Sequence, residues 1–173
     1  MYLRYLFVIV SVIVYYLLQV SVFPAITFLT VTPNLLLSFT ICYALLRGKK
    51  AGMLCGILCG LVWDILVGSL LGLSTFCLLI LGYVTGIFSD TLSPEDAKFP
   101  TLIVFTGDLL FGMTTYFILF LFRRQFDFEY YFLNIMMPEA VFSALMTLLI
   151  FPITYKIHSA LLKYEKRRSI KFG

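Results

Sequence analysis

Six long apolar runs occupy most of the 173 residues, and the charged residues are concentrated between and after these runs. Hydrophobic residues make up 61% of the chain and charged residues 13%, compared with roughly 45–50% and about 25% in soluble domains. A soluble chain of this size has too little interior for so many apolar side chains. The sequence therefore predicts an all-α integral membrane protein, a six-transmembrane-helix bundle that forms a single membrane domain over residues 1–173. The predicted spans cover about residues 5–24, 31–46, 51–67, 70–88, 101–122 and 132–155, followed by a basic tail at 156–173.

The distribution of cations predicts how the chain crosses the membrane. With six spans, one side carries eleven Lys and Arg residues and the other carries only Arg123 and Arg124. Because cationic loops stay in the cytoplasm, both termini are expected there. The first run is long for a signal peptide core and lacks a small-x-small cleavage site, so we expect a retained helix. The eleven cations are Arg4, Arg47, Lys49, Lys50, Lys98, Lys156, Lys163, Lys166, Arg167, Arg168 and Lys171.

A series of small residues at every fourth position runs from the third apolar run into the fourth. On a helix this spacing forms a slowly rotating groove. Small residues let helix backbones approach closely, which is how helices associate in lipid. Two interpretations are open: packing within the fold, for which Gly82 and Gly86 repeat the spacing in the fourth run, or a contact surface for another membrane protein. The candidate groove consists of Gly52, Gly56, Gly60, Asp64, Gly68 and Gly72.

Three acids, Asp64, Asp108 and Glu139, lie within the predicted spans. A charge there costs at least about 2.5 kcal/mol at a helix centre, so each acid should face protein or water. We expect Asp64 and Glu139 in the outer half of the membrane and Asp108 nearer the cytoplasmic side. The spans offer no Lys, Arg or His as partners, so the acids are either protonated or satisfied by a partner chain.

Asp64 is the acid with the most specific expectation. We expect its carboxylate to accept hydrogen bonds from the turn at Gly68 or from a partner helix, and the alternative is a headgroup-level carboxylate satisfied by water. Next to Glu139, Pro138 leaves the carbonyl of Asn134 without its helical hydrogen bond, and a kink is expected there.

We expect no enzyme activity and no catalytic, cofactor or metal site. An aspartyl dyad needs two carboxyl groups close enough to share a proton, and Asp64 and Asp108 are predicted at different depths. The four cysteines are interpreted as packing residues rather than disulfide partners or zinc ligands. His158 is interpreted as a solvated interfacial residue. The basic tail is expected to lie on anionic lipid, with a cytoplasmic partner as the alternative and no role in nucleic acid binding.

Two segments carry a family resemblance. One is Thr32-Pro33-Asn34-Leu35-Leu36-Leu37, and the other is Gly56-x-x-x-Gly60-Leu61-x-x-Asp64-x-x-x-Gly68-x-x-x-Gly72-Leu73. They resemble the Pro-Asn-Leu-Leu element and the Gly-Leu-x-x-Asp-x-x-x-Gly-x-x-x-Gly run of the bacterial rod shape-determining protein MreD family. Length, short loops and a basic C-terminus are also similar, so the resemblance covers essentially the whole chain.

This resemblance implies a non-catalytic, multi-pass subunit of the cell-elongation (rod) complex, or elongasome, in the bacterial cytoplasmic (inner) membrane. Family members bind MreC and, through it, act with MreB, RodA and a class B penicillin-binding protein to direct side-wall peptidoglycan synthesis and cell shape. The family is also structurally similar to the membrane substrate-binding subunits of vitamin importers. The alternative function is therefore a small-molecule-binding importer subunit, although the short loops here offer no obvious lid for a pocket.

Overall fold

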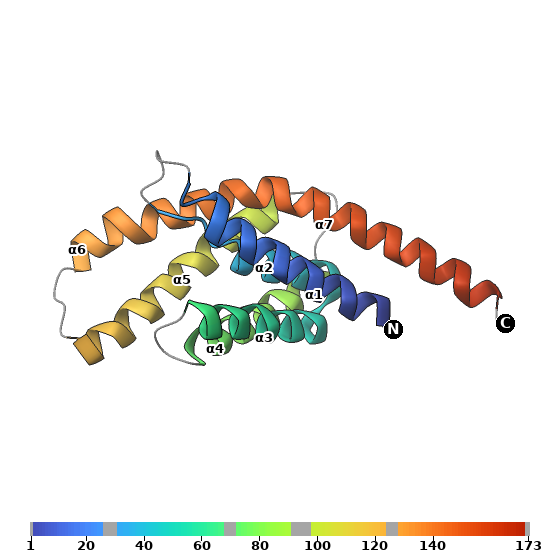
Figure 1. Cartoon of the computed structure of the whole chain (residues 1–173), viewed down its shortest axis with the longest axis horizontal. Helices are drawn as coiled ribbons and strands as arrows, with labels where there is room; N and C mark the ends of the chain where they lie inside the picture. The colour runs from blue at the N-terminus through green and yellow to red at the C-terminus, as the bar shows by residue number, and fades with distance from the viewer. Residues whose placement is uncertain (1, 26–30, 68–71, 91–97, 124–127, 172–173) are drawn as a thin grey trace.

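The computed structural model describes residues 2–25, 31–67, 72–90, 98–123 and 128–171, and every element within these ranges is helical. The predicted all-α class is therefore confirmed for the described residues. Consecutive long helices reverse direction, so that α1 begins and α7 ends at the same end of the bundle (Figure 1). In chain order the elements are α1 (Tyr2–Leu17), the π segment η1 (Leu18–Val22), α2 (Leu35–Arg47), α3 (Lys49–Leu66), α4 (Leu73–Ile87), the short 3₁₀ turn η2 (Phe88–Asp90), α5 (Lys98–Arg123), α6 (Phe128–Tyr131), the π segment η3 (Phe132–Met136) and α7 (Met137–Lys171).

Two stretches of described helix are long and apolar enough to cross a membrane. They are Lys98–Ile118 in α5 and Phe128–Ala160, which begins at α6 and continues into α7. Three further apolar helices are shorter, namely Leu6–Val22, Leu35–Arg47 and Leu73–Ile87. The last helix continues to Lys171, so the residues expected to form a tail after 155 are helical.

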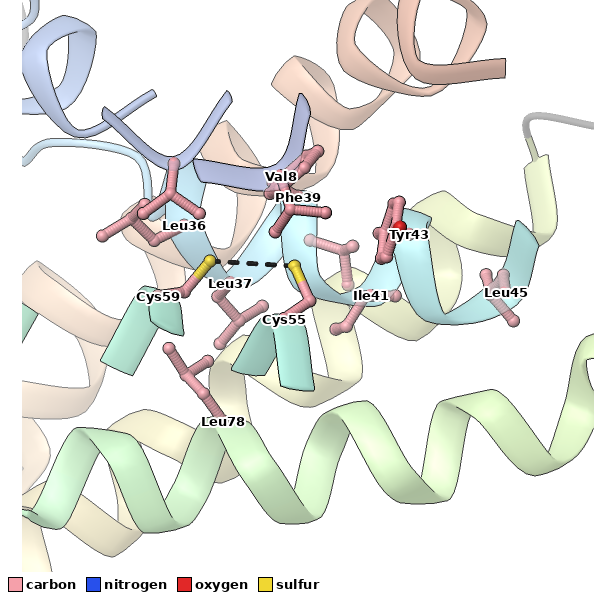
Figure 2. Close-up of a cluster of buried hydrophobic side chains, with 12 residues drawn as sticks. Val8, Leu36, Leu37, Phe39, Ile41, Tyr43, Leu45, Cys55, Cys59 and Leu78 are labelled. Atoms are coloured by element: carbon pink, nitrogen blue, oxygen red, sulfur yellow. Dashed lines mark hydrogen bonds between the residues drawn. The ribbon is translucent and has the colours of Figure 1, made fainter. Parts of the chain in front are cut away.

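The central element is α2, whose residues from Leu35 to Leu45 are all buried. A helix that is apolar on every side must be covered on every side, and α2 contacts α1, α3, α4, α5 and α7. Figure 2 shows its side chains meeting Val8 from α1, Cys55 and Cys59 from α3 and Leu78 from α4. The bundle is therefore built around a short helix of 13 residues, which is about 20 Å long.

The cysteines contribute to this core as free thiols. Cys42, Cys55 and Cys59 are buried, and Cys77 is half-buried. The sulfur atoms of Cys55 and Cys59 lie 4.0 Å apart in a weak hydrogen bond, drawn as the dashed line in Figure 2.

The chain reverses between α2 and α3 at a single residue, Gly48. Its φ is +82°, a conformation that residues with a Cβ rarely adopt. The N–H of Gly48 donates to the carbonyl of Ala44 at 2.8 Å, which closes the last turn of α2. This glycine therefore allows α3 to begin immediately after α2 ends.

The region before Pro138 departs from α-helical geometry. This departure is expected, because proline has no backbone N–H to donate to the preceding turn. Residues Phe132–Met136 form the π segment η3, and the side-chain amide of Asn134 donates to the carbonyl of Tyr130 at 3.0 Å. A π segment accommodates an interrupted helical ladder without ending the helix. The expected disruption therefore takes the form of a π segment.

Large apolar side chains cover much of the exterior of the bundle. Monomeric soluble proteins rarely expose contiguous apolar surface on this scale. Representative exposed residues are Ile9 and Ile13 on α1, Ile65 on α3, Phe76 on α4, Leu102 on α5, and Leu145 and Leu149 on α7.

Candidate functional site

The backbones of α3 and α4 touch along the glycine series. A Cβ added to Gly52 would overlap the carbonyl oxygen of Gly82, and one added to Gly56 would overlap that of Leu78. A Cβ on Gly60 would likewise overlap the backbone of α4. The groove on α3 is therefore occupied by this chain's own α4. The glycines in the contact are Gly52, Gly56, Gly60, Gly82 and Gly86.

Asp64 lies one turn beyond Gly60, is buried, and binds the beginning of α4. Its Oδ2 accepts the backbone N–H groups of Gly72 at 3.0 Å and Thr75 at 2.9 Å, and the hydroxyl of Thr75 at 2.6 Å. Its Oδ1 accepts the N–H of Ser74 at 3.1 Å. Both carboxylate oxygens are therefore engaged by one short segment.

This segment needs an acceptor because the first N–H groups of a helix have no partner within the helix. The N-cap position of α4 is Gly72, which has no side chain to supply an acceptor. Asp64 provides this cap from the preceding helix, and its negative charge suits the positive end of the α4 dipole.

The expectation that Asp64 needs a proton or a partner chain was therefore wrong, because backbone donors at a helix start satisfy it. Its partners are the first residues of α4, and Gly68 lies outside the described residues.

A second polar cluster surrounds the start of α2. The side-chain oxygen of Gln19 accepts the N–H groups of Leu35 at 3.0 Å and Leu36 at 3.3 Å. The N–H of Asn34 donates to the hydroxyl of Ser143 on α7 at 2.8 Å. The side-chain oxygen of Asn34 accepts the N–H of Leu37 at 3.2 Å. Asn34 therefore acts as the N-cap of α2. Side chains from η1 and α7 therefore complete the capping of the central helix.

Asp108 connects α5 to this cluster. Its Oδ1 accepts a hydrogen bond from the side-chain amide of Asn34 at 3.3 Å, and the hydroxyl of Ser143 also interacts with its carboxyl group. Its Oδ2 is buried and has no hydrogen-bond partner. The start of α2 is thus the junction at which η1, α5 and α7 meet.

Asp108 and Ser143 both bind Asn34, and Glu139 lies one turn of α7 away from Ser143, so Glu139 lies closer to the level of Asp108 than predicted. The register of α5 against η3 agrees, since a Cβ added to Gly112 would lie 3.1 Å from the side chain of Met136. The helix before Glu139 begins at Phe128 rather than at the predicted 132, and this places Glu139 deeper in the bundle.

Sequence reasoning assigned no role to Gln19, Asn34 and Ser143, which organise this junction. A signal for Asn34 was present, because Asn after Pro and before an apolar run is a typical N-cap. Gln19 is a lone amide in an apolar run, a position where a polar group must find an internal partner. Ser143 offered no comparable signal.

The assignment of His158 as a solvated residue was wrong, because the structure buries it. It continues the buried stripe of α7, which recurs every three or four residues. Because α7 extends beyond the predicted span, this position faces protein rather than the membrane surface. The stripe consists of Ala140, Ser143, Ala144, Thr147, Ile150, Phe151, Thr154 and His158.

The acids of the two sites therefore serve different junctions, since Asp64 binds α4 and Asp108 binds α2. Within the described ranges, no three side chains of His, Cys, Asp or Glu lie together in a group that could hold a metal. These buried acids can hold the N-terminal ends of α2 and α4 in place against neighbouring helices.

Buried, paired polar groups inside an apolar exterior define this chain as a helical membrane protein. The match to a known family agrees with that class. The family model for the rod shape-determining protein MreD matches residues 1–160, and the chain therefore belongs to the MreD family of rod shape-determining membrane proteins. Comparison with curated proteins and with solved structures gave no match.

Proposed function

We propose that this chain is a non-catalytic, multi-pass subunit of the bacterial cell-elongation complex in the cytoplasmic membrane. In this proposal it binds MreC directly and, through the complex, acts with MreB, RodA and a class B penicillin-binding protein to direct side-wall peptidoglycan synthesis. The observation that carries the proposal is the family match over residues 1–160. The apolar exterior and the capped internal helix ends support a membrane subunit that fixes geometry.

We further propose six membrane crossings with both termini in the cytoplasm. The alternating helix directions and the common end at which α1 begins and α7 ends support an even number of crossings (Figure 1). Although α2 is shorter than the roughly 30 Å hydrocarbon core, it is enclosed by other helices. The polar residues at its start are therefore shielded from lipid, which is the condition under which non-helical backbone is tolerated at membrane depth.

The α3–α4 hairpin is the part that we propose to contact MreC. Backbone contact at the glycines and the cap from Asp64 hold the two helices as one unit. Beside that cap, Ile65 and Leu66 are exposed at 68% and 57%. A single-span partner could pack against such an apolar surface in lipid, and its fit would depend on the geometry that Asp64 fixes.

Two measurements test this function. Both use a rod-shaped bacterial host that lacks its own MreD gene. The chain should restore rod shape, and affinity purification of the tagged chain in mild detergent should recover MreC. Replacing the exposed pair Ile65 and Leu66 by Ala should reduce recovery of MreC, whereas the matched change of exposed Leu145 and Leu149 on α7 should not. A stable, membrane-inserted chain that neither restores shape nor recovers MreC would contradict the proposal.

A further inference from the structure

The level at which the bundle ends on its cationic side can be located on α7. The N–H of Asn34, at the start of α2, donates to the hydroxyl of Ser143 on α7, and further along both helices Cys42 packs in one cluster with Ile150 and Phe151. The two helices therefore run in the same direction. An equal rise along each helix leads from Asn34 to Arg47, the last residue of α2, and from Ser143 to Lys156, an exposed residue of α7. Lys156 thus marks the level at which α2 ends and α3 begins.

The last helix continues well past this level. From Lys156 to Lys171 the helical rise adds up to about 22 Å. Figure 1 shows this end of α7 extending beyond the start of α1 and beyond the adjacent ends of α3 and α4. Transmembrane helices tilt by at most about 40°, and at that tilt Lys171 would still lie about 17 Å from the level of Lys156. The attraction of anionic lipid falls off within a Debye length, which is about 8 Å at physiological salt. A continuous helix therefore carries the end of the chain beyond the reach of the lipid charge.

The projecting segment, residues 161–171, is strongly cationic. Its cations recur at spacings of three and four residues, as in Lys163 and Arg167 or Arg167 and Lys171. Residues at these spacings are neighbours on a helix, and like charges there destabilise it. A helical end of this length also has little stability of its own in water. An acidic partner surface would remove the repulsion and stabilise the helix. The cations are Lys163, Lys166, Arg167, Arg168 and Lys171, and the single acid is Glu165.

We propose that residues 161–171 form a docking helix for an acidic surface of a cytoplasmic protein. This proposal replaces the expectation that the basic tail lies on anionic lipid, because the continuous helix carries the segment away from the membrane. It rests on the proposed topology, which places the end of α7 in the cytoplasm. It does not depend on the binding of MreC.

Binding of a fluorescent polyglutamate peptide to the full-length chain in lipid nanodiscs tests whether the segment is free to bind an acidic partner. At physiological salt the affinity should be the same in nanodiscs of phosphatidylcholine and in nanodiscs that also contain phosphatidylglycerol. Arg167→Gln combined with Arg168→Gln should weaken binding about tenfold. The matched pair Lys49→Gln and Lys50→Gln, which removes two exposed cations at the start of α3, should leave it unchanged. Loss of peptide binding in the anionic nanodiscs would show that the segment lies on lipid and would overturn the proposal.

Photocrosslinking in the rod-shaped host tests the kind of partner. A photoreactive residue in place of Ile170 should form an adduct with an acidic cytoplasmic protein, and Arg167→Gln combined with Arg168→Gln should abolish this adduct. Absence of a protein adduct, or an adduct that persists in the charge variant, would overturn the inference. Failure of the topology gives a different result, because Lys156→Cys would then react with an impermeant maleimide in intact cells.

Discussion

The carboxylate of Asp64, near the end of α3, accepts the backbone N–H of Thr75, the third residue of α4, at 2.9 Å. An acid in the last turn of a helix is disfavoured by that helix's own dipole. Here the cost is offset, because the same carboxylate lies at the positive end of the antiparallel neighbour and satisfies its free N–H groups. The acid that interrupts the glycine series is therefore the group that fixes one end of the hairpin.

Replacing Asp64 by Ala should destabilise the hairpin more than replacing it by Asn. Ala leaves three backbone N–H groups without an acceptor, and an unsatisfied buried donor costs about 1–3 kcal/mol. Asn keeps one oxygen, which in the position of Oδ2 preserves the three bonds to Gly72 and Thr75. The free energy of unfolding in detergent should therefore fall in the order wild type, Asn, Ala.

Recovery of MreC and restoration of rod shape should follow the same order, with membrane insertion unchanged. Equal stability of Asp64→Ala and the wild type would show that water satisfies the helix start and that Asp64 is only tolerated.

Gly56→Ala should be destabilising, whereas Gly112→Ala should be close to neutral. The new methyl group at Gly56 would meet the backbone carbonyl of Leu78, which can move only if the helices separate. At Gly112 it would meet the flexible side chain of Met136 at 3.1 Å. Overpacking costs about 1–3 kcal/mol, so thermal unfolding should separate the two variants. Equal melting temperatures would contradict a rigid backbone contact between α3 and α4.

Much of the fold follows from local patterns in the sequence. The apolar runs indicate the helices, and the four-residue glycine spacing indicates a close backbone contact because only a missing side chain permits one. The partner of that contact was harder to predict. Gly82 and Gly86 offered a match within the chain, but spacing alone does not distinguish an internal helix from a partner.

The polar junctions were predicted least well, because they depend on pairing across long sequence distances. Asp64 was recognised as an unusual acid, yet its donors are backbone N–H groups of a helix start, which leave no mark in the residue types. The level of Glu139 relative to Asp108 depends on helix register. An error of four residues in where a helix begins is enough to shift a side chain by about 6 Å along the axis.

Gln19→Met should destabilise the start of α2 although it preserves the length of the side chain. The N–H of Leu36 would lose its acceptor in a buried position, at a cost of about 1–3 kcal/mol, whereas the N–H of Leu35 keeps the carbonyl of Pro33 at 3.1 Å. Asn134→Leu is a matched control, since it also removes an amide but from an exposed position on η3. Hydrogen exchange of the α2 amides should rise in the first variant and stay unchanged in the second. Unchanged exchange in both would show that Asn34 suffices to cap the helix.

The proposed topology predicts which exposed positions a membrane-impermeant maleimide can reach in intact cells. Single cysteines at Lys50 and Lys156 should be labelled only after lysis, because the cationic end of the bundle is placed in the cytoplasm. A cysteine at Glu129, on α6 at the opposite end, should be labelled without lysis (Figure 1). Replacing the half-buried Cys77 by Ala removes the most accessible native thiol and provides the background for all three variants. Labelling of Lys156→Cys in intact cells, or protection of Glu129→Cys, would contradict six crossings with both termini inside.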